Sequence, residues 1–107
     1  MAKDTTLFEV NNEQLSAVSF VHDYIELVFY ERIIRVFTAP FVKNTEGEYK
    51  YPKVGSRDAL CSLIGRTVVS INILGGKRVE LYFSGGEALA IPLSSEDQEI
   101  IEADRKS

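Results

Sequence analysis

Two short segments of this chain share a strand pattern that limits how the whole chain can fold. Residues 23–29 read DYIELVF and residues 77–83 read KRVELYF, so both follow the order x-x-aliphatic-Glu-Leu-x-Phe. Each is preceded and followed by a segment in which apolar and polar residues alternate, which is typical of half-buried β-strands. We therefore expect two three-stranded antiparallel meanders, at residues 15–38 and 66–93.

The turns of the first meander determine which side chains share a face, because a shift of one residue turns every side chain of a strand to the other side. Turns of two residues, at 22–23 and 31–32, would pair Leu27 of the middle strand with Val18 on one side and Val36 on the other. A four-residue loop at the second turn would keep the same face. The first meander is therefore expected to be apolar on one side.

The second meander needs longer loops to give the same result. Loops of three residues, at 74–76 and 84–86, pair Val79 with Ile71 on one side and Ile91 on the other. Both loops end in a glycine, which readily adopts the left-handed conformation that such loops favour at the third residue. All four turns then place the strongest apolar residues on one buried face. These residues are Val18, Phe20, Ile25, Leu27, Phe29, Ile34, Val36, Val69, Ile71, Ile73, Val79, Leu81, Phe83, Leu89 and Ile91.

A short helix is expected between the meanders, at residues 57–64. Residues 40–56, which hold two prolines, two glycines and mixed charge, are predicted to form a loop before it. Ser56 suits the helix start and Gly65 suits a left-handed residue after its end. The apolar positions of this helix, spaced i, i+3 and i+4, are Leu60, Leu63 and Ile64.

These elements predict an α+β fold, mostly antiparallel β, in a single domain over residues 1–107. The two meanders would form one curved sheet or open barrel, with the short helix packed on its concave face. The acidic end of the chain, residues 95–107, starts with a capping-box pattern and is expected to form a helix at about 96–104 or a tail.

The composition and net charge of the chain disfavour several classes of function. The chain has 107 residues, a net charge of −4 and a pI of about 5.0, which disfavours a general nucleic-acid binder because such proteins need a basic face. A single cysteine excludes an internal disulfide. The N-terminus has no signal-peptide pattern, and no apolar run approaches the roughly 20 residues that span a bilayer. We expect a soluble cytoplasmic protein that binds neither nucleic acid nor membrane.

Several motifs resemble those of small bacterial proteins that have no assigned function. The stretch SRDALCSLIGRTV at 56–68 matches a hydrophobic helix that precedes a G-x-x-V strand, and LYFSGG at 81–86 with LAIPL at 89–93 matches an F-x-x-G turn before the last strand. The resemblance covers residues 16–94. It implies a fold and a bacterial source, and it implies no catalytic residue.

Two side chains are candidates for catalysis. His22, beside Asp23 and near Glu26, could act as a general base, but a polar hairpin turn explains the same residues and is favoured. Cys61 could act as a nucleophile, but a small buried apolar residue within the helix is the favoured interpretation. One histidine and one cysteine do not complete a zinc site. We expect no cofactor and no metal, and an enzyme is the least favoured class.

Two further patterns are explained by strands and turns. The glycines at 75–76 and 85–86 suggest a phosphate loop, but a strand follows each pair where a phosphate loop needs a helix, so hairpin turns are favoured. Glu26 and Glu80 take equivalent positions in the two meanders and could form a carboxylate pair. The predicted register instead places both on the face opposite the core.

The outer face of the first meander is too apolar for a face in water. It carries Val21, Tyr24, Val28, Tyr30, Ile33 and Phe37, interrupted by Glu26 and Arg35. Large exposed apolar patches mark interfaces. We therefore expect partner binding through Tyr24, Val28, Tyr30, Ile33 and Phe37. The alternative is that residues 40–55, which carry Phe41, Val42, Tyr49 and Tyr51, fold over this face.

The function most consistent with these features is a non-catalytic protein-interaction or assembly module, either a homodimer or bound to another protein. An immunity-like inhibitor of a partner protein is one version. The alternative is a half-barrel that binds a small apolar ligand between sheet and helix. Its lining would be Phe20, Phe29 and Phe83.

Overall fold

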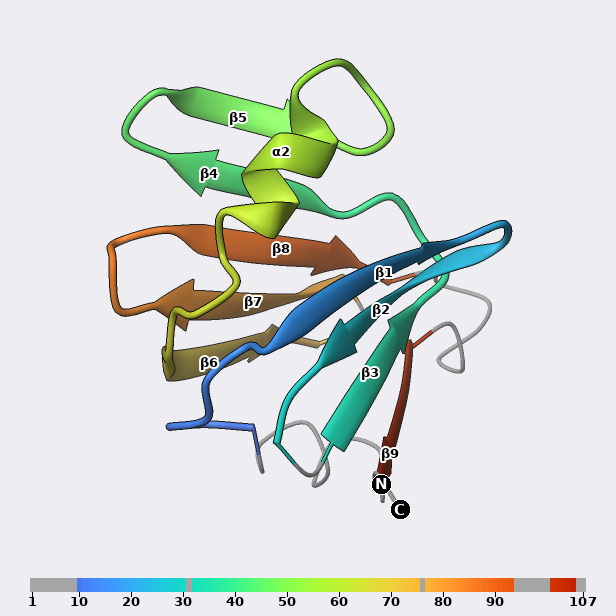
Figure 1. Cartoon of the computed structure of the whole chain (residues 1–107), viewed down its shortest axis with the longest axis vertical. Coiled ribbons are helices and arrows are strands. Elements are labelled where there is room, and N and C mark those ends of the chain that lie inside the picture. Colours follow the sequence, from blue (N-terminus) through green and yellow to red (C-terminus); the bar gives the residue numbers. More distant parts are fainter. Residues whose placement is uncertain (1–9, 31, 76, 94–100, 106–107) are drawn as a thin grey trace.

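The chain folds into two antiparallel sheets and one short helix (Figure 1). The structure is a computed structural model that describes residues 10–30, 32–75 and 77–93, and the backbone of residues 101–105. The first sheet has the order β1-β2-β3-β9 and the second has the order β5-β4-β8-β7-β6. The strands of the first sheet are β1 (Ala17–Val21), β2 (Tyr24–Val28), β3 (Arg32–Val36) and β9 (Ile101–Arg105). The strands of the second sheet are β4 (Phe41–Asn44), β5 (Gly47–Lys50), β6 (Val68–Leu74), β7 (Arg78–Phe83) and β8 (Ala88–Pro92).

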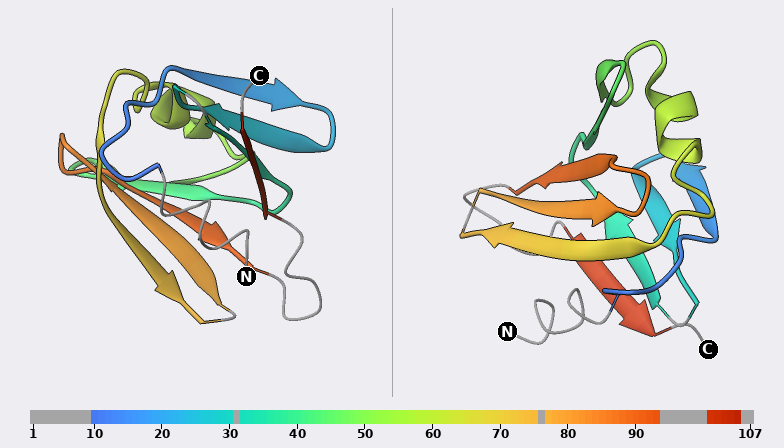
Figure 2. Two further views of the ribbon diagram at one scale, coloured as in Figure 1. Left: turned by 90° about the horizontal axis from the view of Figure 1, so that it is seen from below. Right: turned by 90° about the vertical axis from the view of Figure 1, so that its left-hand side faces the viewer.

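The two expected meanders are present, but they lie in different sheets. The prediction of one curved sheet or open barrel is therefore wrong (Figure 2). The physical reason is that each meander pairs at its open edge with a strand that the sequence pattern did not reveal. Strand β9 joins β3 in the first sheet, and β4 joins β8 in the second.

The register is as predicted at one turn of each meander. Val18 lies opposite Leu27 in the β1–β2 pair, and Val79 lies opposite Ile91 in the β7–β8 pair. In the β2–β3 pair the prediction is wrong by two residues, since Leu27 lies opposite Ile34. The turn is placed earlier in the chain than expected. A shift of two residues leaves each side chain on its predicted face.

The β6–β7 pair is also shifted by two residues, and it contains a bulge. Ile71 lies opposite Leu81 rather than Val79. The register breaks between Val68 and Ser70, so the side chains before the bulge change faces. Val69 was expected in the core and is 51% exposed, whereas its neighbour Val68 is fully buried.

Residues 40–56 were expected to form a loop, but they contain the hairpin of β4 and β5. The turn is formed by the Asn44 side chain, whose Oδ1 accepts hydrogen bonds from the N–H groups of Glu46 (2.8 Å) and Gly47 (3.1 Å). Such side-chain to backbone bonds make Asn a strong turn residue. Val42 of β4 is fully buried, so this hairpin contributes to the core.

The helix α2 (Ser56–Cys61) is shorter than the predicted 57–64 and begins differently. Its N-cap is Gly55, with φ 89° and no side-chain cap bond, and Ser56 is the first helical residue and buried. Gly65 has φ 91°, as expected for a residue that ends a helical segment. Leu60 is buried, but Ile64 is 42% exposed, so the predicted apolar stripe is narrower. The helix contacts β1, β4 and β5.

The end of the chain was expected to be helical at about 96–104. Residues 101–105 instead form β9, which pairs antiparallel with β3 and places Ile101 opposite Val36. Residues 95–100, 106 and 107 lie outside the described residues. An acidic composition did not prevent strand formation, because an edge strand needs only one neighbour for its backbone hydrogen bonds.

One apolar cluster fills the space between the sheets. It contains residues from both sheets, from α2 and from the segment before β1. Its buried members are Val10, Leu15, Ile25, Leu27, Phe29, Ile34, Val36, Val42, Ala59, Leu60, Leu63, Val68, Val79, Leu81, Phe83, Leu89 and Ile91. The predicted core residues Val18, Phe20, Ile71 and Ile73 are partly buried against it. Within the described residues, no helix combines the length and apolar character needed to cross a membrane.

Candidate functional site

The His22 turn is not a catalytic arrangement. The side chains of His22 and Asp23 are 95% and 83% exposed, and His22 Nε2 lies 3.6 Å from Asp23 Oδ1. Glu26 does not join them, because its Oε2 pairs with Nε of Arg35 at 3.1 Å. The favoured interpretation of a polar hairpin turn is confirmed, since residues 22–23 connect β1 to β2.

Cys61 is exposed at the end of α2, so the expectation of a small buried apolar residue is wrong. The helix ends at this residue, and its buried side chains are Ser56, Ala59 and Leu60. In the part of the chain that the structure describes, no group of three or more His, Cys, Asp or Glu side chains could hold a metal ion.

The glycine pairs form hairpin loops. Residues 84–86 connect β7 to β8, and Gly86 takes the left-handed φ of 93° that a three-residue loop favours. Gly75 lies in the loop between β6 and β7, and Gly76 lies outside the described residues. The hairpin interpretation is confirmed at 85–86.

Glu26 and Glu80 do not form a carboxylate pair. Each lies on the outer face of its own sheet, and each pairs with an arginine of that face. The two sheets bury their inner faces in a shared core, so their outer faces point apart. No acid–base chemistry between these two residues follows from the fold.

The outer face of β2 and β3 carries two cross-strand pairs and, beside them, a stacked pair of aromatic rings. Val28 lies opposite Ile33, and Glu26 lies opposite Arg35. The ring of Tyr24 stacks on that of Phe37, with centroids 5.1 Å apart and planes at 11°. Phe37 is 40% exposed and Tyr30, in the turn beside this face, is 76% exposed. The structure therefore brings four of the five predicted partner-binding residues onto one face.

Most of the side chains of residues 40–55 that were considered as a cover for this face lie elsewhere, but Tyr51 and Pro52 line a hollow together with Tyr24 and Phe37. Val42 is buried in the core, and Tyr49 and Tyr51 pack against that core. The ring of Tyr51 stacks on Phe20 with centroids 5.8 Å apart, and the Arg57 guanidinium lies 5.2 Å from the centroid of Tyr51. Phe41 lies on the outer side of the second sheet.

The three phenylalanines that were expected to line a ligand site between sheet and helix belong to the core or pack against it. Phe29 is fully buried and Phe83 is 3% exposed, both within the core cluster. Phe20 is partly buried against that cluster and stacks on Tyr51.

A depression that the sequence did not reveal lies on the outer face of the second sheet. Its volume is about 430 Å³. Its floor is formed by Ala88 and Ala90 of β8, with Phe41 of β4 on one side and Tyr82 and Glu80 of β7 on the other. We call this depression the alanine trough. The sequence feature that indicates the trough is the pair of small residues at alternate positions of β8. Its second wall is formed by β4, however, and these residues were expected to form a loop.

The polar groups of the alanine trough are held in a fixed arrangement. Tyr82 Oη donates a hydrogen bond to Oε1 of Glu80 at 2.5 Å, and Nε of Arg78 lies 2.7 Å from Oε2 of the same carboxylate. The Tyr82 bond, then Arg78 and Asn72, lower the pKa of Glu80 below its ordinary value. The same bond raises the pKa of Tyr82, because the neutral phenol is the donor.

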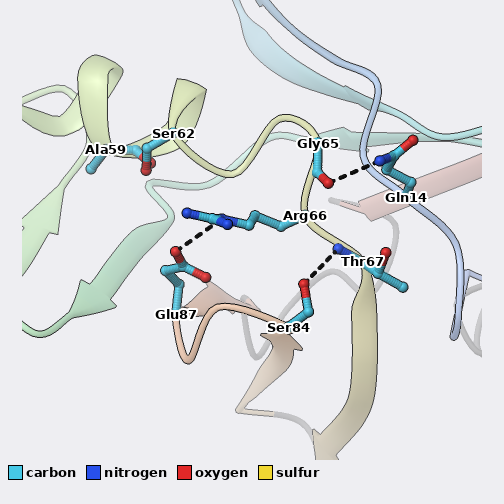
Figure 3. A network of polar contacts seen from close by, with 8 residues as sticks. All are labelled: Gln14, Ala59, Ser62, Gly65, Arg66, Thr67, Ser84 and Glu87. Carbon is cyan, nitrogen blue, oxygen red and sulfur yellow. Dashed lines mark hydrogen bonds and ion pairs between the residues drawn. The ribbon is translucent and has the colours of Figure 1, made fainter.

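A second polar network lies beside the turn that connects β7 to β8 (Figure 3). Arg66 Nε lies 3.3 Å from Oε2 of Glu87, and the backbone N–H of Thr67 donates to Oγ of Ser84 at 3.2 Å. Gln14 Nε2 donates to the carbonyl oxygen of Gly65 at 2.9 Å. These bonds connect three chain segments, so we assign this network a structural role.

No protein-family model, curated protein or solved structure matches this chain. The resemblance to small bacterial domains therefore gains no support from comparison.

Proposed function

We propose that this protein is a non-catalytic assembly module that forms a homodimer through the outer face of its first sheet. The observation that carries the proposal is the cross-strand pairing on that face. An apolar pair, Val28 and Ile33, and an aromatic pair, Tyr24 and Phe37, lie on either side of the Glu26–Arg35 ion pair. Exposed apolar patches mark protein interfaces, and aromatic residues are enriched in them.

This arrangement favours a second copy of the chain as the partner. In a two-fold interface the same patch is used by both subunits, so the patch must complement itself. A two-fold axis that runs parallel to the strands through the centre of this face would bring Arg35 close to Glu26 of the partner subunit, and the reverse. The apolar pair of each subunit would then contact the same pair of the other, and the aromatic pairs would likewise meet each other.

A different protein with a complementary face could occupy the same surface. An immunity-like inhibitor would act in this way, by covering a functional surface of its partner. The single cysteine is compatible with a reducing compartment such as the cytoplasm, where we expect the protein to act.

The test is the oligomeric state of a matched pair of variants. Val28→Lys places a charge in the apolar pair of the proposed interface, whereas Val69→Lys places one on β6, where the native side chain is 51% exposed. Size-exclusion chromatography with light scattering should give a dimer for the wild type and for Val69→Lys, and a folded monomer for Val28→Lys. A wild-type protein that stays monomeric at millimolar concentration contradicts the homodimer.

A further inference from the structure

We propose that the alanine trough binds a small, flat aromatic carboxylate. This inference concerns the second sheet and does not depend on the proposed dimer face. The trough combines a concave apolar floor with a few fixed polar groups, and this combination is typical of small-molecule sites.

The shape of the trough follows from the strand register. Ala90 lies opposite Phe41 on one side and Glu80 on the other. One row away, Ala88 lies opposite Lys43 and Tyr82. The small residues occupy the middle strand and the large residues occupy its neighbours, so the floor is lower than both walls.

The width of the trough suits one aromatic ring. Strands β4 and β7 are separated by β8, so their backbones lie about 10 Å apart at a spacing of roughly 4.8 Å per strand. Carbon atoms in contact lie about 3.5–4.0 Å apart. A single flat ring system can therefore lie between the side chains of Phe41 and Tyr82 and touch the half-buried Ala88, whereas Ala90 is only 4% exposed.

The charge of the ligand follows from which polar groups are already engaged. The Glu80 carboxylate receives the hydrogen bond of Tyr82 and the ion pair with Arg78, so it is not placed to bind a cation. The guanidinium of Arg78 approaches Glu80 through Nε, and its side chain is 44% exposed. Arg78 is one of the residues that line the trough, so its exposed guanidinium is the cation that a ligand there would meet. Two N–H groups side by side are the geometry that binds a carboxylate in a bidentate manner.

The opposite wall supplies a second cation. Lys43 is 59% exposed and its Nζ lies 3.5 Å from Oε2 of Glu48, which is equally exposed. An exposed pair of this kind contributes little stability and is easily exchanged for another partner. With Lys43 beside Glu48 and Arg78 beside Glu80, each of these two carboxylates of the trough has a cation next to it.

The experiment uses 2-naphthoate as the probe and the full chain as the protein. Titration should shift the amide NMR signals of β4, β7 and β8 around the trough and leave those of β2 and β3 unchanged. The neutral analogue 2-naphthylmethanol should bind at least about fivefold more weakly. Equal affinity of the two compounds would contradict the role of the carboxylate, and no shifts at millimolar naphthoate would contradict the site.

Two variants separate the apolar from the ionic contribution. Ala88→Leu fills the floor and should weaken naphthoate binding at least about tenfold, and Arg78→Met should reduce its affinity to that of the neutral analogue. Val69→Leu, an enlargement at an exposed position of the same sheet, is the matched control and should bind as the wild type does. The amide spectrum of each variant reports whether it is folded. Unchanged affinity in a folded Ala88→Leu protein would overturn the proposal.

Discussion

Tyr82 donates a hydrogen bond to Glu80, two residues before it on the same strand. Residues two apart on a strand lie on the same face, so this contact is built into β7 itself. Arg78, two residues further back, completes the row with its ion pair to Glu80. The outer face of β7 therefore carries a line of three polar side chains that fix one another.

Loss of the phenol group should change the titration of Glu80. In Tyr82→Phe the largest cause of the lowered Glu80 pKa is absent, so that pKa should rise toward its ordinary value. Carboxyl-carbon NMR titration measures the change directly. Tyr30→Phe is the control, since this tyrosine is 76% exposed in a turn on the other sheet, and it should leave the Glu80 titration unchanged.

The same contact predicts opposite effects at the two ends of the pH range. The lowered pKa of Glu80 means that its contribution to stability is present above the pKa of the unfolded chain and is lost as the pH falls through the folded value. The raised pKa of Tyr82 means that its contribution is present below the unfolded value and is lost as the pH rises through the folded one. Denaturant midpoints of Tyr82→Phe should therefore depend less on pH at both ends than those of the wild type.

Because of the bulge in β6, the neighbouring residues Val68 and Val69 differ in burial. Val68→Ala removes methyl groups from a fully buried side chain and should lower the free energy of unfolding by about 2 kcal/mol. Val69→Ala affects a side chain that is 51% exposed and should change the free energy of unfolding by less than about 0.5 kcal/mol. Urea denaturation measures both, and equal losses would show that the bulge is misplaced.

The β7–β8 turn depends on a left-handed residue. Gly86 has φ 93° and open space where an alanine methyl group would lie, so the cost of Gly86→Ala should come from the backbone alone, at about 1–2 kcal/mol. Gly75→Ala is the matched control, because that site is also open and its φ lies outside the left-handed range. Thermal or urea denaturation should show a loss for the first variant only.

Exposure of Cys61 predicts reactivity in the folded state. A thiol reagent such as 5,5′-dithiobis(2-nitrobenzoate) should modify the native protein completely without denaturant, because the side chain is exposed. Cys61→Ser should change the free energy of unfolding by less than about 0.5 kcal/mol. Modification that requires denaturant would place this side chain in the core instead.

The faces of the strands could be predicted from the sequence because the side-chain period of a strand is two. Leu27 and Val79 are buried as expected, although each lies opposite a different residue than predicted on one side. A register error of two residues is invisible to the alternation pattern. Only a shift by one residue moves a side chain to the other face of the sheet. The bulge produces such a shift at Val69.

The β4 strand of the second sheet could not be predicted in this way. It has four residues, too few to show a clear period, and Asn44 at its end and Gly47 at the start of β5 are typical of a hairpin turn and of a loop alike. Without β4 the outer face of β8 has no second wall, so the small side chain of Ala88 does not by itself predict a trough. The alanine trough depends on a pairing distant in sequence.

Because β1–β3 and β6–β8 bury their apolar sides against each other, neither group of strands has an interior of its own. In isolation each group would expose its apolar face to water. Each group of strands provides the apolar surface on which the other group buries its side chains. The two groups of strands should therefore fold together in one cooperative step. A destabilising substitution in either group should lower the stability of both equally.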